Sequence, residues 1–125
     1  EETLLPAIRL TQKLDIAVVG IGYPNEKSAI MATGYFKENE IESLIDRKVA
    51  GELCMQFYDI YGDTAPYKDD NNVIGMDISM LRSVPRSIGI AGGVEKLRAV
   101  RGAINGHYIN TLITDIECAE ALISE

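Results

Sequence analysis

The sequence of 125 residues contains no tryptophan, one histidine and two phenylalanines, and it lacks any long apolar segment. A helix that crosses a membrane needs about 20 consecutive apolar residues. The longest apolar run here, from Ile16 to Ile21, is interrupted by Gly20 and suits one short buried strand. The chain also starts with two glutamates, whereas a signal peptide starts with basic residues. We therefore expect a cytoplasmic protein without membrane contact.

Clustered basic residues are also missing. The 12 Lys and Arg residues are outnumbered by 19 Asp and Glu residues, which gives a formal net charge of −7. A surface that holds duplex DNA needs grouped lysines and arginines to neutralise the phosphates. The composition therefore indicates that this chain does not itself bind DNA.

The residues that usually carry catalysis or hold metals are sparse. Cys54 and Cys118 lie far apart in apolar surroundings, which favours buried free thiols over a disulfide or a metal site. His107 follows Asn105-Gly106, and no serine or cysteine lies in a recognisable nucleophile elbow, so a turn role is favoured over a base. The carboxylates are scattered and no pair can be assigned acid and base roles. We expect no catalytic residue, metal or cofactor.

Short β-branched runs alternate with amphipathic segments along the chain. This alternation predicts one domain with a three-layer α/β/α, Rossmann-like fold and a mostly parallel sheet covered on both faces. Thr114 and Glu117 match a capping box for a final helix. The expected strands lie near residues 15–21, 53–58, 73–77, 87–91 and 110–114, and the expected helices over 4–14, 38–47 and 94–104 and at the C-terminal end.

Glycines mark the ends of two expected strands. Gly20 and Gly22 end the first strand, and Gly92-Gly93 ends a later one. In open parallel sheets, ligands bind beyond the carboxyl ends of the strands, where glycines let the backbone approach and helix N-termini attract anions. The same glycines would also serve simply as tight turns. The third glycine of a dinucleotide fingerprint is missing.

Two charged residues lie next to these turns. Lys96 falls in the first turn of the helix after Gly92-Gly93, where its ammonium would reach a phosphate held by the helix N-terminus, or remain solvated. Glu52 starts the strand that follows Gly51, where it would accept hydrogen bonds from sugar hydroxyls or simply face water. Spacing alone does not decide between these roles.

Four motifs together resemble a known family. The segment from Ser87 to Asp115, with its Ala-Gly-Gly-x-x-Lys turn and its Leu-Ile-Thr-Asp strand, resembles the C-terminal signature of the SorC family of bacterial transcriptional regulators. The other three resemblances are the Asp-x-x-hydrophobic-Gly-Ile-Gly strand at 15–22, the element Lys-Val-Ala-Gly-Glu at 48–52 and the Phe-x-Asp-x-x-Gly turn at 57–62.

The resemblance implies a fold related to ribose-5-phosphate isomerase, glucosamine-6-phosphate deaminase and the CoA transferases. It implies an effector domain that binds a sugar or sugar phosphate and forms a homo-oligomer, either dimer or tetramer, while a separate helix-turn-helix domain binds the operator. Residues 1–125 would be the C-terminal portion of that effector domain. By motif, Lys96 would contact a phosphate, Glu52 would contact sugar hydroxyls, and the pocket would also include Gly20, Gly22, Gly92 and Gly93.

Two departures from the family pattern stand out: Lys48 replaces a glycine, and the Gly-Thr-Thr-like phosphate loop of the first half is absent. A half-domain would leave apolar surface uncovered, so we also expect dependence on a partner. The alternative function is a sugar-phosphate isomerase or deaminase on the same fold. However, the loops typical of those enzymes are not found, and Gly22 leads instead into Tyr23-Pro-Asn. A nucleotide-binding module would rest on Gly-x-Gly alone.

Overall fold

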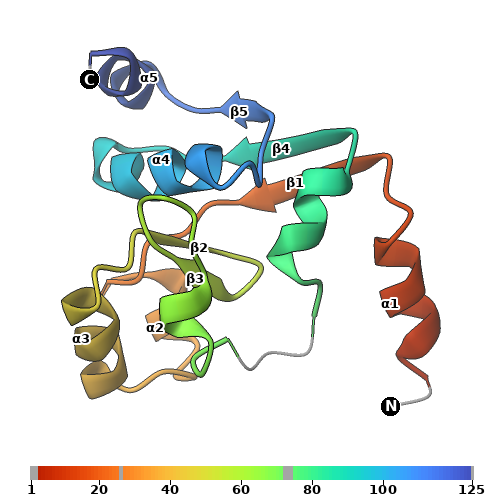
Figure 1. Ribbon diagram of the computed structural model, residues 1–125. Helices are drawn as coiled ribbons and strands as arrows, with labels where there is room; N and C mark the ends of the chain where they lie inside the picture. The colour runs from red at the N-terminus through yellow and green to blue at the C-terminus, as the bar shows by residue number, and fades with distance from the viewer. Residues whose placement is uncertain (1–2, 26, 72–74, 125) are drawn as a thin grey trace.

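The computed structural model describes residues 3–25, 27–71 and 75–124 (Figure 1). Helices and strands alternate along this part of the chain. In chain order they are α1 (Leu5–Thr11), β1 (Ile16–Gly20), α2 (Ala29–Ala32), α3 (Glu38–Asp46), β2 (Gly51–Leu53), β3 (Gln56–Tyr58), η1 (Ala65–Tyr67), η2 (Ile78–Ser83), β4 (Arg86–Ile90), η3 (Val94–Lys96), α4 (Leu97–Asn105), β5 (Thr111–Ile113) and α5 (Ile116–Ile123), where η denotes a 3₁₀ helix.

The main sheet has three strands in the order β1-β4-β5, and both pairings are parallel. Its register sets Val18 beside Ile88 and Ile90 beside Ile113. The expectation of an α/β fold with a mostly parallel sheet is confirmed. No helix among the described residues is long and apolar enough to cross a membrane.

The single strand expected over 53–58 is wrong, because the chain turns back on itself there. β2 and β3 form an antiparallel hairpin in which Glu52 pairs with Phe57. Cys54 and Met55 make the two-residue turn, with φ of 52° and 65°. Positive φ at both positions is the geometry of the tight hairpin turn that asparagine and glycine normally occupy. Since neither asparagine nor glycine occupies position 54 or 55, the sequence carries no signal for this turn.

The strand expected at 73–77 is also wrong where it can be checked. Residues 73–74 lie outside the described residues, and residues 75–77 form no strand. Asp77 instead starts η2, because its carboxylate accepts the Ser79 N–H at 2.8 Å. A short acidic side chain that satisfies a backbone donor in this way favours a helix start over a continuing strand.

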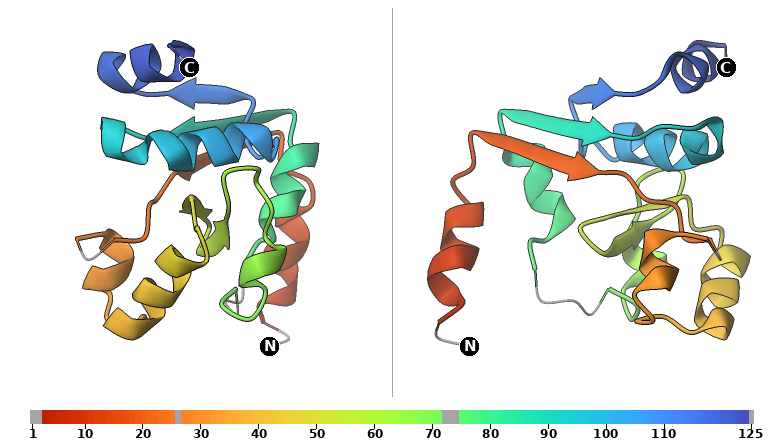
Figure 2. Two further views of the ribbon diagram at one scale, coloured as in Figure 1. Left: turned by 60° about the vertical axis from the view of Figure 1, so that its left-hand side comes forward. Right: turned by 180° about the vertical axis from the view of Figure 1, so that it is seen from behind.

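The core lies on one side of the main sheet. α4 contributes Ala99, Val100 and Ala103 to it, and the hairpin contributes Leu53 and Tyr58. On the other side Ile16, Val18 and Ile90 are exposed and Ile88 is half-buried. The right-hand view of Figure 2 shows both strands (orange and turquoise) unobstructed. The expectation that the first strand is buried on both faces is therefore wrong.

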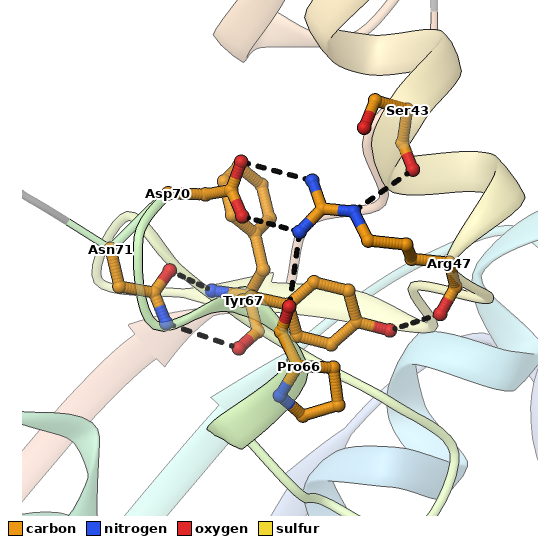
Figure 3. A network of polar contacts seen from close by, with 7 residues as sticks. Ser43, Arg47, Pro66, Tyr67, Asp70 and Asn71 are labelled. Atoms are coloured by element: carbon orange, nitrogen blue, oxygen red, sulfur yellow. Dashed lines mark hydrogen bonds and ion pairs between the residues drawn. The ribbon is translucent and has the colours of Figure 1, made fainter.

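A second cluster joins α3 to the hairpin through apolar and polar contacts (Figure 3). The Arg47 guanidinium pairs with both oxygens of Asp70 at 2.7 and 3.0 Å, and the Tyr67 hydroxyl donates to the Arg47 carbonyl at 2.9 Å. The Asn71 amide oxygen accepts the Phe57 N–H at 2.8 Å, so it continues the hydrogen bonding of β3. Residues 65–71 thereby hold the hairpin against α3.

The Asn71 contact predicts a specific stability loss. Phe57 is fully buried, and replacing Asn71 with Ala leaves its N–H without an acceptor. We expect N71A to lower the free energy of unfolding by about 1–3 kcal/mol in urea denaturation. N71D keeps an acceptor oxygen for the Phe57 N–H but loses the amide donor to the Phe57 carbonyl at 3.4 Å, so it should recover only part of the loss. Equal stability of N71A and the wild type would contradict a structural role for this amide.

Candidate functional site

A cavity of about 400 Å³ lies beyond the carboxyl end of β1. Among the described residues, three parts of the chain form its wall: residues 22–25 and 27–29 after β1, the β2–β3 hairpin and η3. The hairpin supplies Glu52, and η3 supplies Glu95 and Lys96. This is the place where ligands bind to open parallel sheets.

Gly22 and Glu52 connect the sheet to the hairpin. The Gly22 N–H donates to the Glu52 carbonyl at 3.0 Å, and the Glu52 N–H donates to the Gly22 carbonyl at 2.9 Å. A Cβ atom added at Gly22 would overlap the Glu52 carboxylate. Any side chain at position 22 would therefore displace the Glu52 carboxylate, so glycine there preserves the orientation of that carboxylate.

The Glu52 carboxylate is partly withdrawn from water. One of its oxygens, Oε2, accepts the Met55 N–H at 3.0 Å. Burial raises the pKa of Glu52, while the hydrogen bond from Met55 and the positive charge of Lys96 act in the opposite direction. The carboxylate thus has a fixed orientation and an acceptor oxygen, Oε1, next to the cavity wall at Gly22.

Lys96 is also held in place. It lies at the start of α4, and its Nζ donates to the carbonyl of Ile21 at 3.1 Å. This contact joins the beginning of α4 to the end of β1 and brings the ammonium group to the cavity. Gly22, Glu52 and Lys96, which the sequence singled out separately, therefore lie at one site.

The other three glycines lie elsewhere. Gly20 is exposed and does not line the cavity. The Gly93 N–H, at φ 96°, donates to the carboxylate of Asp115, and Gly92 lies beside the same carboxylate. Neither glycine lines the cavity. The backbone donor that an anion would need at this turn is already bound to a carboxylate of the protein.

Asp115 also caps the last helix. Its carboxylate accepts the Cys118 N–H at 2.8 Å, and the hydrogen bonds from Cys118 and Gly93 lower its pKa. The capping role expected for Thr114 is wrong, because the N-cap of α5 is Asp115, one residue further along. The Thr114 hydroxyl oxygen is buried and has no hydrogen-bond partner among the described residues. Asp115 fits better because its carboxylate reaches both the helix and the Gly93 turn.

Several cavity residues were missed from the sequence. Tyr23, Asn25 and Lys27 line the cavity from the segment after β1, and Glu95 lines it beside Lys96. Their signal was only positional, because any residue just beyond the carboxyl end of a parallel strand is a candidate for the site. With Glu52 and Lys96, the described residues of the lining include two lysines and two glutamates, whose formal charges cancel.

The remaining candidates have structural explanations. His107 has a φ of 57°, and its N–H donates to the Ile104 carbonyl at 3.0 Å, which confirms the turn role. Cys54 and Cys118 are free thiols, Cys118 fully buried and Cys54 partly so. Within residues 3–25, 27–71 and 75–124, no group of three or more His, Cys, Asp or Glu side chains is placed to hold a metal ion.

Comparison with known proteins gives consistent matches. The Sugar-bind family of sugar-binding domains matches residues 1–124. The sorbitol operon regulator of Klebsiella pneumoniae is 38% identical over 110 residues, which are 88% of this chain and 35% of that regulator. The deoxyribonucleoside regulator of Bacillus subtilis is 31% identical over 118 residues, 94% of this chain and 37% of that protein. The chain spans little more than a third of these relatives.

Solved structures agree with the sequence matches. The full-length sorbitol operon regulator of K. pneumoniae superposes with a TM-score of 0.83 at 34% identity, over 98% of this chain and 40% of that one. The sugar-binding domain of a transcriptional repressor from Vibrio fischeri gives 0.82 at 27% identity, over 99% of this chain and 50% of that one. The resemblance to SorC regulators is confirmed, and the chain belongs to the Sugar-bind family of sugar-binding domains.

Proposed function

We propose that this chain is part of the effector-sensing domain of a bacterial transcriptional regulator and binds a sugar or phosphorylated sugar in the cavity beyond β1. The observation that carries the proposal is the convergence of Gly22, Glu52 and Lys96 on that cavity. Its volume of about 400 Å³ lies within the usual range of small-molecule sites. The relatives reported above are named as an operon regulator, a deoxyribonucleoside regulator and a transcriptional repressor, which favours a sensor over the isomerase or deaminase alternative.

The charged groups of the cavity recognise different parts of the effector. The oriented carboxylate of Glu52 accepts hydrogen bonds from sugar hydroxyls, as carboxylates with a free acceptor oxygen do. Lys96, with Lys27 nearby, attracts an anionic group such as a phosphate. Gly92 and Gly93 act on this site indirectly, because the hydrogen bond from Gly93 to Asp115 fixes the turn that precedes η3, and Gly92 lies beside the same carboxylate. Gly20 also acts indirectly, because it ends β1 and so precedes the residues that line the cavity.

The wider role follows from the same proposal. With a net charge of −7, this domain leaves operator binding to a separate helix-turn-helix domain. The regulator works in the cytoplasm as a homo-oligomer, and effector binding changes its affinity for operator DNA. The Klebsiella and Bacillus relatives are named for sorbitol and deoxyribonucleosides, so a small polyhydroxylated effector is the class that we propose here.

The first prediction from this proposed function concerns Lys96. Replacing Lys96 with Ala removes the cation that is anchored on Ile21. We expect the affinity for a phosphorylated sugar to fall by about 1.5–3 kcal/mol, which is roughly ten- to hundredfold. Calorimetric titration of the intact regulator, with a ligand selected from a panel of pentose and hexose phosphates, measures the change. K96R should recover part of the loss, because its planar guanidinium presents its donors differently.

Lys13 provides the control, since it is exposed at the end of α1 and does not line the cavity. K13A should bind like the wild type. The unphosphorylated parent sugar should lose less affinity than the phosphate when Lys96 is removed. Equal binding of the phosphorylated sugar by K96A and the wild type would remove Lys96 from the site.

The second prediction concerns Glu52 and pH. Burial raises its pKa in the folded state, so the folded protein holds this proton more tightly than the unfolded chain does. Its contribution to stability is therefore fully present below the ordinary pKa of 4.5 and is lost as the pH rises through the folded pKa. Glutamine does not ionise, so E52Q does not lose this contribution to stability as the pH rises. In urea denaturation, we expect the stability of E52Q relative to the wild type to increase from acid to neutral pH.

Sugar binding should change in the opposite direction. E52Q replaces a charged acceptor with a neutral amide, so affinity for the sugar should fall at neutral pH, although the stability of E52Q relative to the wild type is higher there than in acid. The combination separates a binding role from a structural one. A variant that is less stable than the wild type at neutral pH, with unchanged sugar affinity, would show that Glu52 serves the fold alone.

A further inference from the structure

Glu95 is a cavity residue to which the proposed function gives no role. It is the middle residue of η3 and lines the cavity directly before Lys96. Its carboxylate lies over the turn that precedes η3, because a Cβ atom added at Gly93 would overlap both of its oxygens. Glu95 therefore brings an acidic group both to the cavity wall and to the Gly92-Gly93 turn.

The same turn contacts a second carboxylate. The Gly93 N–H donates to Asp115, and an Asp115 oxygen lies 3.3 Å from the place that a Cβ atom of Gly92 would take. A turn that holds a phosphate presents free backbone N–H groups and positive charge to it. Here the turn has a carboxylate over the Gly93 Cα and another on the Gly93 N–H. It is therefore unfavourable for an anion, although its glycines are typical of a phosphate site.

The lysines of the cavity lie close to carboxylates of the protein. The Lys96 ammonium donates to the Ile21 carbonyl, and its charge acts on the carboxylate of Glu52. Among the described lining residues, the two lysines are matched by two glutamates. A phosphate ester adds a charge of about −1.5 to −2 at pH 7 to this balanced lining. An unphosphorylated sugar adds no charge, and its hydroxyls can donate to the carboxylates.

We propose that Glu95 is a specificity-determining residue of this site, whose carboxylate repels the phosphate of a phosphorylated sugar and so lowers its affinity relative to the unphosphorylated parent. Repulsion between like charges is a common way for a binding site to reject a near relative of its ligand. Glu95 is exposed, so water and salt screen its charge and the effect is moderate. The inference rests on the proposed function, because it assigns a preference to the same cavity.

Substitution of Glu95 tests this preference in the intact regulator. Calorimetric titration compares one phosphorylated sugar with its unphosphorylated parent, chosen from a panel of pentoses, hexoses and their phosphates. We expect E95Q to bind the phosphorylated sugar roughly three- to thirtyfold more tightly than the wild type does, and the parent sugar no more tightly. The gain should shrink at high ionic strength. E95D keeps the charge and should keep most of the wild-type preference.

Glu42 of α3 provides the matched control, since it is exposed and does not line the cavity. E42Q changes the net charge by the same amount as E95Q and should leave both affinities unchanged. Inorganic phosphate gives a readout that needs no sugar. E95Q should bind inorganic phosphate more tightly than the wild type and E42Q do.

The outcomes separate this inference from the proposed function. If the wild type binds no sugar and no sugar phosphate of the panel, the proposed function is overturned, and the preference assigned to Glu95 with it. If the sugars bind but E95Q gains no affinity for the phosphorylated sugar or for inorganic phosphate, only the role of Glu95 is overturned. The same conclusion follows if E42Q gains as much affinity as E95Q, because the effect would then come from net charge.

Discussion

The antiparallel bridge between Gly22 and Glu52 is the contact on which the site depends. Its two backbone hydrogen bonds join the end of a parallel strand to a hairpin that belongs to a different sheet. Without that junction, the carboxylate of Glu52 would lie neither over Gly22 nor close enough to interact with the charge of Lys96, whose ammonium is bonded to Ile21. The close approach also means that a side chain at position 22 would displace the Glu52 carboxylate.

The hairpin that carries Glu52 is held from both sides. Gly22 fixes β2, while Asn71 binds the backbone of Phe57 in β3, the residue paired with Glu52. Arg47, at the end of α3, binds Asp70 and the carbonyl of Pro66, so it holds the segment that contains Asn71 against α3. A binding side chain on so constrained a support loses little freedom when a ligand arrives, which is the physical basis of preorganised recognition.

This arrangement has a cost in stability that points to function. A carboxylate that is partly buried and bonded to one N–H would be more stable in water, and a raised pKa records that preference. Structural roles rarely require such a group at a cavity wall.

The alternation of apolar runs was enough to determine β1, β4, β5, α3 and α4, because period and burial are local properties of the chain. Family motifs selected Gly22, Glu52 and Lys96, but their spacing could not show that they meet, since 74 positions separate Gly22 from Lys96. Only the tertiary structure decided the hairpin at Cys54 and Met55, whose positive φ angles are imposed by strand pairing rather than by residue type. It also decided that Asp115 takes the Gly93 donor, because a carboxylate and a turn 22 residues apart meet only after the strands align side by side.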